Sequence, residues 1–374
     1  MQSKLLLLVV VGLVLSVGGY VFSQPKVMEG EPLKIGAIFA LSGNAAQYGE
    51  WARNAVELAV REVNENGGIN RRMVTVLYED NEGQAAPAVS AYRKLTDTDD
   101  VRYVLTFQSS VALAVAPLAN ADKILQMDVS ATTPNYSTPD DFTFRTGIVA
   151  NQLGVEAARY LSSAADTGKL AVLYINNDFG VGMRDIFREN YDGDIAAEEA
   201  FAQDSFDFRT PLAKVGAVGA DTVFLVGHLR EAGTLVKQAR ELGVRTRFFS
   251  DIYAIEGSDF LDAAGDAADG VRYLAPKFDA SDAARGVAVF VKKYQEIYGE
   301  EPNVFAAQAY DGITVLLRAM EGCEYENTEC VRQNLHDIDF EGASGRIVFD
   351  INGDTEKPVQ LKAVRNRAFI VEPR

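Results

Sequence analysis

Histidine and cysteine, the side chains that most often carry covalent and metal chemistry, are scarce in this sequence. The 374 residues include two histidines, His228 and His336, and two cysteines, Cys323 and Cys330. His336 lies in a charged stretch and is expected at the surface. His228 follows an apolar run, residues 222–226, that reads as a strand. Because parallel sheets bind ligands at the carboxyl ends of their strands, His228 is a candidate cleft residue rather than a catalytic base.

Sequence motifs of enzymes are missing. Gly342-Ala343-Ser344-Gly345 places its second glycine one residue too early for a nucleophile elbow. Gly180-Val181-Gly182 imitates a dinucleotide fingerprint, but Asp185 occupies the third glycine position and would repel a pyrophosphate. No phosphate loop, His-Glu-x-x-His motif or calcium loop occurs, and two thiols are too few ligands for zinc. We therefore expect a protein that is not an enzyme and that needs no cofactor or metal.

The amino terminus has the pattern of an export signal. Lys4 is followed by 18 residues without a charge, and Val21 and Ser23 suit cleavage before Gln24. We therefore expect residues 1–23 to be a signal peptide and the protein to be periplasmic or extracellular. An uncleaved N-terminal anchor is the alternative, because an apolar stretch of this length can just span a bilayer.

Export places the two cysteines in an oxidising compartment. The six residues between Cys323 and Cys330 are polar and turn-like, so the two Cα atoms can approach to about 5.5 Å. We expect one local disulfide, with two free thiols as the alternative.

Charge and composition exclude several classes of protein. Asp and Glu number 53 against 36 Lys and Arg, which gives a formal net charge of −17 and opposes a phosphate backbone. Nucleic acid is therefore not an expected partner. The 48% hydrophobic content predicts a globular chain with a large core, and the length favours two domains.

Apolar runs of strand length alternate with amphipathic stretches of helix length from Leu33 onward, which predicts parallel sheets covered by helices. In a first series we expect strands at 33–40, 73–79, 102–107 and 124–127, with helices at 49–66, 87–98 and 112–121. In a second series we expect strands at 170–175, 195–201, 222–226, 247–250 and 271–274, with helices at 151–162, 182–190, 208–218, 231–242 and 259–264. Helices at 282–298, 304–321 and 329–337 and short strands at 347–349, 359–364 and 368–371 complete the chain. The expected fold class is α/β, with two doubly wound lobes of parallel sheet that face a shared cleft.

Hydroxyl-rich turns follow two neighbouring predicted strands. Ser109 and Ser110 follow the strand that ends at Phe107, and Ser130-Ala131-Thr132-Thr133 follows the strand at 124–127. Both turns can simply cap helices. They also converge on one crevice, where hydroxyls and the amides of helix N-termini suit a small anion such as a carboxylate. We therefore expect the two turns to form part of a ligand site.

A series of short motifs runs through the chain from Pro32 to the C-terminus. These motifs are Lys34-Ile35-Gly36, Leu41-Ser42-Gly43, Tyr48-Gly49, Val63-Asn64-Glu65-Asn66-Gly67-Gly68-Ile69, Asn177-Asp178-Phe179-Gly180, Ala264-Gly265-Asp266-Ala267-Ala268-Asp269-Gly270 and Ala306-Ala307-Gln308-Ala309-Tyr310-Asp311-Gly312. In this order and spacing the sequence resembles the periplasmic solute-binding proteins of ABC transporters, in the branched-chain amino acid and amide group with the type I periplasmic binding protein fold.

The resemblance implies two lobes joined by a hinge of three crossovers, near Thr146, Pro276 and Asp350. The expected domains are residues 32–146 plus 277–350 for lobe 1, and residues 147–276 plus 351–374 for lobe 2. A ligand would be trapped between the lobes when the hinge closes.

The resemblance also implies which residues contact the ligand. Ser109, Ser110 and the segment Ser130, Ala131 and Thr132 would hold a carboxylate or amide, and Phe179 would cap the ligand from the second lobe. Tyr48 takes the position of another pocket aromatic residue in the family.

The resemblance also points to residues around the other end of the ligand. His228 with Leu229 falls where the family often has aromatic contacts. Amino-acid binders also carry an acid after the strand at 247–250, whereas this sequence has Tyr253 near that position, with Asp251 close by.

The function implied by the resemblance is a receptor that binds a small polar solute, a branched-chain or other amino acid, and delivers it to an ABC permease. Two alternatives stay open. One is a binder of amides or of aromatic or aliphatic carboxylates, and the other is the ligand-sensing domain of a signalling system.

Overall fold

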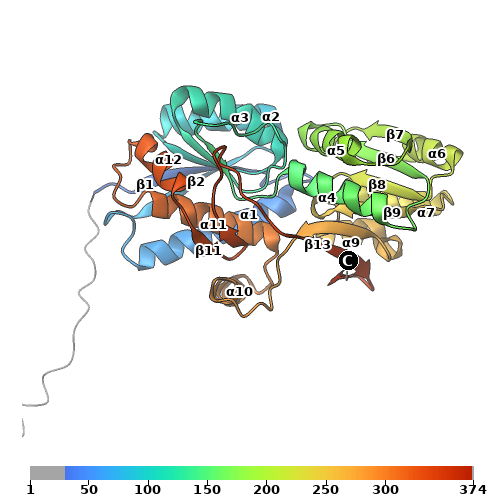
Figure 1. Ribbon diagram of the computed structural model, residues 1–374. Helices are drawn as coiled ribbons and strands as arrows, with labels where there is room; N and C mark the ends of the chain where they lie inside the picture. Colours follow the sequence, from blue (N-terminus) through green and yellow to red (C-terminus); the bar gives the residue numbers. More distant parts are fainter. Residues whose placement is uncertain (1–29, 373–374) are drawn as a thin grey trace, which may run out of the picture.

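The computed structural model describes residues 30–372, so the predicted signal peptide lies outside the described residues. Two α/β halves lie side by side in it, each built around one sheet (Figure 1). We call the half with the five-stranded sheet lobe 1 and the half with the seven-stranded sheet lobe 2. Over residues 30–372, no helix is long and apolar enough to cross a membrane.

Lobe 1 contains a parallel sheet in the strand order β2-β1-β3-β4-β5. Its strands are β1 (Leu33–Phe39), β2 (Val74–Asp80), β3 (Tyr103–Thr106), β4 (Leu125–Asp128) and β5 (Thr143–Arg145). The early helices of this lobe are α1 (Ala46–Glu65), α2 (Ala85–Arg93), the π-helix η1 (Lys94–Thr98) and α3 (Ser109–Asp122). The later chain adds α10 (Arg285–Tyr298), α11 (Val304–Ala319), α12 (Thr328–His336) and the hairpin β11 (Phe340–Gly342) and β12 (Gly345–Ile347).

Both faces of the lobe 1 sheet are buried, as a parallel sheet requires. Consecutive residues of β1 point to opposite faces: Ile38 packs in the cluster that contains Tyr92 of α2 and Val115 of α3. Phe39 packs in the main core on the other face, where α1 contacts α11. The apolar run of β1 therefore fits a central strand.

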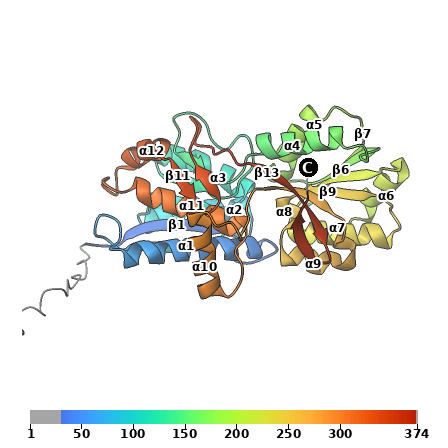
Figure 2. The ribbon, with the colours of Figure 1, turned by 60° about the horizontal axis from the view of Figure 1, so that its bottom comes forward.

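Lobe 2 contains a sheet in the order β14-β13-β10-β9-β8-β6-β7, in which the pairs β10–β13 and β13–β14 are antiparallel and the other pairs are parallel. Its strands are β6 (Leu170–Ile175), β7 (Ile195–Phe201), β8 (Thr222–Val226), β9 (Arg247–Asp251), β10 (Arg272–Pro276), β13 (Val359–Arg365) and β14 (Ala368–Val371). Its helices are α4 (Ala150–Ser163), α5 (Asp178–Asn190), α6 (Arg209–Val218), α7 (Leu229–Glu241), α8 (Ile252–Ile255), α9 (Ser258–Ala264) and the 3-10 helix η2 (Gly265–Ala268). Figure 2 shows β13 running from the lobe 1 side into this sheet.

The chain passes between the two lobes more than once. Residues 33–145 form the first sheet, and residues 170–276 together with 359–371 form the second. The helices α10 to α12 lie between β10 and β13 in sequence, and α11 returns to pack on α1 of lobe 1. The boundaries near Thr146, Pro276 and Asp350 stay predictions.

Two glycines bring helix starts close to strand ends. A Cβ atom on Gly49 would lie 1.8 Å from the carbonyl oxygen of Ala40, and one on Gly180 would lie 1.9 Å from that of Ile175. No other residue fits such contacts. The glycines therefore set the first turns of α1 and α5, and with them the adjacent aromatic residues Tyr48 and Phe179.

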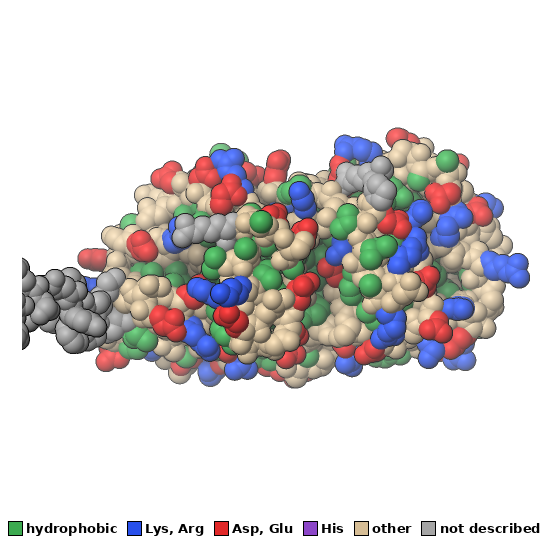
Figure 3. Space-filling model, turned by 90° about the horizontal axis from the view of Figure 1, so that it is seen from below, with side chains coloured by type: hydrophobic (Ala, Val, Ile, Leu, Met, Phe, Trp, Pro, Cys, Tyr) green, Lys and Arg blue, Asp and Glu red, His purple; other side chains and the backbone are tan. Residues whose placement is uncertain are grey.

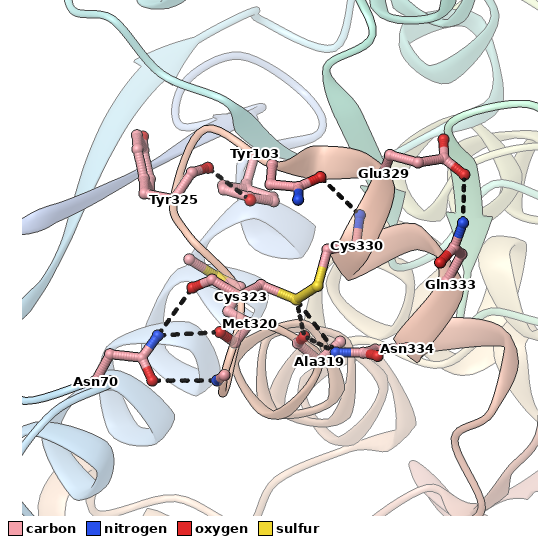
Figure 4. The surroundings of a disulfide bond; sticks show 12 residues. Asn70, Tyr103, Ala319, Met320, Cys323, Tyr325, Glu329, Cys330, Gln333 and Asn334 are labelled. Atoms are coloured by element: carbon pink, nitrogen blue, oxygen red, sulfur yellow. Dashed lines mark hydrogen bonds between the residues drawn. A yellow bond between two sulfur atoms is a disulfide. The ribbon is translucent and has the colours of Figure 1, made fainter.

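The predicted disulfide is confirmed. Cys323 and Cys330 are bonded, with their Cα atoms 6.0 Å apart. Asn70 donates hydrogen bonds to the Met320 and Cys323 carbonyls at 3.2 and 3.0 Å, and Tyr103 donates to the Tyr325 carbonyl at 2.7 Å (Figure 4). The closed loop therefore fastens α11 and α12 to the amino ends of the lobe 1 strands.

One local expectation differs from the structure, and two short elements were not predicted. His336, expected at the surface, is partly buried, because its ring packs 5.0 Å from Phe144 of the edge strand β5. The segment after β9 forms the short helix α8, which Asp251 caps by accepting a hydrogen bond from the Tyr253 amide. The hairpin strand β11 was not expected from the sequence.

Charge is distributed rather than concentrated over the face seen in Figure 3. Acidic and basic side chains alternate across both lobes there, with hydrophobic side chains scattered between them. The net charge of −17 is therefore not gathered into one acidic patch on this face.

Candidate ligand-binding site

A cavity lies between the lobes and takes its wall from both of them. Its lining residues are Tyr48, Phe107, Gln108, Ser109 and Ser130 from lobe 1, and Phe179, His228 and Tyr253 from lobe 2. Aromatic rings and polar side chains of both lobes therefore face the same space.

The strands place these residues at the position that their topology predicts. Phe107, Gln108 and Ser109 follow β3, Ser130 follows β4, and His228 follows β8. Tyr48, Phe179 and Tyr253 lie in the first turns of helices α1, α5 and α8, which follow β1, β6 and β9. The cavity therefore lies at the carboxyl ends of both sheets, as expected for doubly wound folds.

Hydrogen bonds between the lobes close the cavity. The Tyr48 hydroxyl donates to the Tyr253 carbonyl, and the Tyr253 hydroxyl donates to the Ser130 carbonyl at 2.8 Å. Nearer the rim, Asn44 Nδ2 donates to Asp204 Oδ1 at 2.8 Å. The structure therefore has its two lobes in contact around the site.

One end of the cavity is built to receive hydrogen-bond acceptors. Ser109 is the first residue of α3, and its Oγ accepts hydrogen bonds from the Thr132 and Thr133 amides at 3.2 and 3.3 Å. Its proton remains available for donation. Gln108, which precedes the helix, has φ +82°, and such strained backbone is often retained at binding sites. This end can hold an anion at a helix N-terminus.

The loop from Asp128 to Thr133 is fixed by buried polar groups. Asp128 Oδ1 accepts hydrogen bonds from the Ser130 amide at 2.7 Å and from the Ala131 amide, and its Oδ2 accepts from the Thr106 hydroxyl at 2.7 Å. Burial raises the pKa of Asp128 to about 6, and these hydrogen bonds oppose the rise. The loop conformation therefore depends on a carboxylate beneath it.

The other end of the cavity is aromatic. Phe179 stacks on His228 with ring centroids 5.4 Å apart and lies 5.3 Å from Tyr253. Tyr48 lies 6.1 Å from His228. Burial lowers the pKa of His228, although the nearby Glu231 opposes this, so the imidazole is neutral at neutral pH. These rings suit an apolar ligand body.

Several buried polar side-chain atoms in or behind the wall lack a hydrogen-bond partner among the described residues. They are Gln108 Oε1, His228 Nδ1, Glu231 Oε2 and Asp251 Oδ2. Asp251 is 1% exposed, and its other oxygen, Oδ1, accepts from the Tyr253 amide at 2.8 Å. Burial raises the pKa of Asp251 to about 7. Buried polar atoms of this kind usually have a hydrogen-bond partner.

The structure brings together six of the ten residues predicted for the site, namely Tyr48, Ser109, Ser130, Phe179, His228 and Tyr253. The other four, Ser110, Ala131, Thr132 and Asp251, are not among the lining residues. Ala131 is buried against Ala112 of α3, and Thr132 is buried with its hydroxyl unpartnered within the described residues. Contact of these four residues with a ligand stays a prediction.

Sequence reasoning missed Phe107 and Gln108 as lining residues. Both stand between a predicted strand and the predicted Ser109, so their position at a strand end was a usable signal. The positive φ of Gln108, which turns it into the cavity wall, has no sequence signature because glycine is the residue that usually marks such a conformation. Within residues 30–372, no group of three or more His, Cys, Asp or Glu side chains could hold a metal ion.

Comparison with known proteins gives consistent matches over most of the chain. A family profile described as "Periplasmic binding protein" matches residues 32–366. A leucine-, isoleucine-, valine-, threonine- and alanine-binding protein of Pseudomonas aeruginosa is 25% identical over 334 residues, which cover 87% of this chain and 88% of that protein.

Solved structures match the fold closely. The branched-chain amino acid transporter substrate binding protein LivJ from Streptococcus pneumoniae, in complex with isoleucine, has a TM-score of 0.82 and 28% identity, covering 91% of this chain and 99% of that one. A solute binding protein of an ABC transporter from R. palustris, in complex with benzoate, has a TM-score of 0.82 and covers 91% and 95% of the two chains. At 20% identity the second likeness concerns the fold alone.

Proposed function

This chain belongs to the periplasmic binding protein family, a family of binding proteins rather than enzymes, and from that premise we propose that it is the receptor of an ABC transporter for a small α-amino acid with an apolar side chain. The amino acid binds in the cavity between the lobes, and the closed complex delivers it to a membrane permease. The export-signal pattern at residues 1–23 agrees with a location in the periplasm.

The observation that carries this proposal is the division of the cavity into three chemical environments. A free hydroxyl proton at a helix N-terminus, on Ser109, suits the carboxylate. The rings of Phe179 and Tyr48 suit an apolar side chain. The unpartnered acceptors, with Asp251 the nearest acid to Tyr253, suit an ammonium group, because a buried ammonium needs a paired carboxylate.

The relatives support the same class of ligand. The protein from Pseudomonas aeruginosa is named for binding leucine, isoleucine, valine, threonine and alanine, and the structure from Streptococcus pneumoniae contains isoleucine. At 25% and 28% identity they support the class rather than a particular amino acid.

A second candidate ligand is a carboxylic acid without an amino group. The observation in its favour is that none of the eight lining residues identified within residues 30–372 is an acid, so Asp251 would have to reach the ligand from behind Tyr253. Aromatic rings and one hydroxyl donor are enough to bind such an acid.

Calorimetric titration with three matched compounds tests the proposal. L-Leucine carries both charged groups, 4-methylpentanoate lacks the ammonium, and L-leucinamide lacks the carboxylate. We expect leucine to bind at least tenfold more tightly than either analogue, because each removed group forfeits a charge-assisted hydrogen bond worth about 1.5–3 kcal/mol.

The pattern of affinities separates the candidates. Tight binding of 4-methylpentanoate with weak binding of leucine would overturn the amino acid in favour of the second candidate. Failure of all three compounds, repeated with alanine and valine, would overturn the proposed ligand class altogether. D-Leucine serves as a control for stereospecific contact, since it has the same charges and the same apolar body.

A further inference from the structure

Arg145 is a buried charge that lies outside the cavity wall. It is the last residue of β5, the strand at which the chain leaves the lobe 1 sheet, and its side chain is 1% exposed. Burying a guanidinium is costly unless every part of it is paired. Its partners therefore indicate what the residue holds in place.

One side of the guanidinium holds the loop next to the ligand site. Arg145 Nη1 donates to the Thr133 carbonyl at 2.7 Å and to the Ala131 carbonyl at 3.2 Å. The amides of the same loop are taken by Asp128 and by Ser109 Oγ. The loop is therefore fixed through its carbonyl groups by Arg145 and through its amides by the other two residues.

The other side of the guanidinium holds a distant part of the chain. Arg145 Nε donates to Asp354 Oδ1 at 2.6 Å and Nη2 donates to Asp354 Oδ2 at 3.0 Å, which makes a two-pronged ion pair. The Arg145 amide also donates to the Gly353 carbonyl at 2.9 Å. Ser137 donates to Asp354 Oδ1 at 2.6 Å. Asp354 lies on the segment that leads into β13 of the lobe 2 sheet.

Three segments thus meet at one side chain: the end of β5, the loop at 131–133 and the segment at 353–354. The first and the third lead from one lobe to the other, since α4 follows β5 and β13 follows Asp354. Thr355 Oγ1 also donates to the Gly147 carbonyl at 3.5 Å, so the two connecting segments run beside each other.

We infer that Arg145 is a positioning residue, which couples the connecting segments between the lobes to the loop that shapes the ligand site. Any movement of Asp354 relative to β5 shifts the guanidinium and, through it, the carbonyls of Ala131 and Thr133. The orientation of the Thr132 and Thr133 amides toward Ser109 then depends on the relative position of the lobes. This inference rests on the proposed function for its consequence on affinity, but its geometry is independent of the ligand.

Hydrogen exchange of the ligand-free protein tests the inference without a ligand. The first variant, Asp354→Asn, removes the charge of the acceptor. The second, Arg145→Lys, keeps the positive charge but lacks the planar guanidinium that donates both to Asp354 and to the loop carbonyls. We expect exchange in the peptide that covers residues 130–133 to accelerate at least tenfold in both variants. Exchange in strand β8 of lobe 2 should keep its wild-type rate. A general loss of stability would instead accelerate exchange in β8 as well.

Two further variants serve as controls. Ser137→Ala removes a single hydrogen bond to Asp354 and leaves no charge unpaired, so a smaller acceleration of about threefold is expected even if the other variants fail to fold. Arg184→Lys makes the same substitution at the arginine that pairs with Glu198 in lobe 2, and exchange at 130–133 should not change.

The affinity for L-leucine is the functional measurement. Asp354→Asn should bind leucine at least tenfold more weakly, although Asp354 does not line the cavity. Unchanged exchange at 130–133 in Asp354→Asn and Ser137→Ala would overturn the inference. If the wild-type protein binds no leucine, the ligand proposed above is wrong, while the exchange measurement still decides the role of Arg145.

Discussion

Thr132 carries a buried hydroxyl that has no hydrogen-bond partner among the described residues. Valine replaces that hydroxyl with a methyl group of similar shape, which removes the cost of an unpaired polar group. We therefore expect Thr132→Val to leave the free energy of unfolding unchanged or higher, while leucine affinity falls about tenfold through the loss of one hydrogen bond. Urea denaturation and calorimetry measure the two effects.

Thr106 offers the matched control. Its hydroxyl donates to Asp128 Oδ2 at 2.7 Å and accepts from Gln126 Nε2 at 2.9 Å, so Thr106→Val should lose about 1–3 kcal/mol of stability. If Thr132→Val binds leucine normally but unfolds more easily, the hydroxyl has a structural role and Thr132 does not belong to the site.

Asp251 is predicted to make the protein sensitive to pH. Its pKa is raised to about 7 by burial, so the native state keeps a proton that the unfolded state, with the ordinary value near 4, releases. Stability therefore falls as pH rises from about 4 to about 7. In Asp251→Asn this contribution disappears, and the variant should become more stable than the wild type by up to about 4 kcal/mol at pH 8.

The same substitution separates stability from binding. An ammonium ligand favours the ionised form of Asp251, so leucine affinity of the wild type should rise with pH through about 7. Asp251→Asn should bind leucine far more weakly at every pH. Tight binding of leucine by this variant would refute the pairing of the ammonium with Asp251.

At the scale of secondary structure, glycine decides how the helices approach the strands. Gly49→Ala would put a methyl group 1.8 Å from the Ala40 carbonyl, so α1 must shift and the variant should lose several kcal/mol of stability. Gly216→Ala in α6 is the control, since its Cβ would meet Val244 at an ordinary 3.7 Å. That change should stabilise the protein by about 0.5–1 kcal/mol. Equal changes in melting temperature for the two variants would contradict the close approach of α1 to the Ala40 carbonyl.

The disulfide fastens elements that lie far from the cleft. The loop between Cys323 and Cys330 contacts the amino ends of strands, for example through the Tyr325 hydroxyl, which donates to the Lys34 carbonyl at 2.6 Å. The double variant Cys323→Ala/Cys330→Ala should lose about 2–3 kcal/mol of stability. Leucine affinity should not change, and a marked loss of affinity would show that the loop also acts on the cleft.

Sequence periodicity was sufficient for the strands and most helices, because buried parallel strands such as β6 and β8 are unbroken apolar runs. It also placed Ser109, Ser130 and His228 at strand ends. It did not reveal α8, since a single turn capped by Asp251 has no period to detect. Nor did it reveal the role of Arg145, because its partners at 131–133 and at Asp354 come together only in the folded chain.

At the scale of the whole molecule, the two lobes meet through polar and aromatic side chains around the cavity. Besides the two tyrosines, Gln203 Nε2 donates to the Gly83 carbonyl at 3.3 Å, Asn44 pairs with Asp204, and Gln47 Nε2 donates to the Ser258 hydroxyl. Water can replace these polar contacts in an open form, so the lobes can separate by a hinge motion. A ligand held by both lobes then favours the closed form.

The central claim is that the lobes close around a small amino acid. Small-angle X-ray scattering with and without saturating L-leucine tests this claim most directly. We predict that leucine reduces the radius of gyration and that the liganded curve fits the closed arrangement in which Tyr253 reaches Ser130. L-Leucinamide at the same concentration should leave the curve unchanged. A radius of gyration that does not change while calorimetry reports bound leucine would contradict the account.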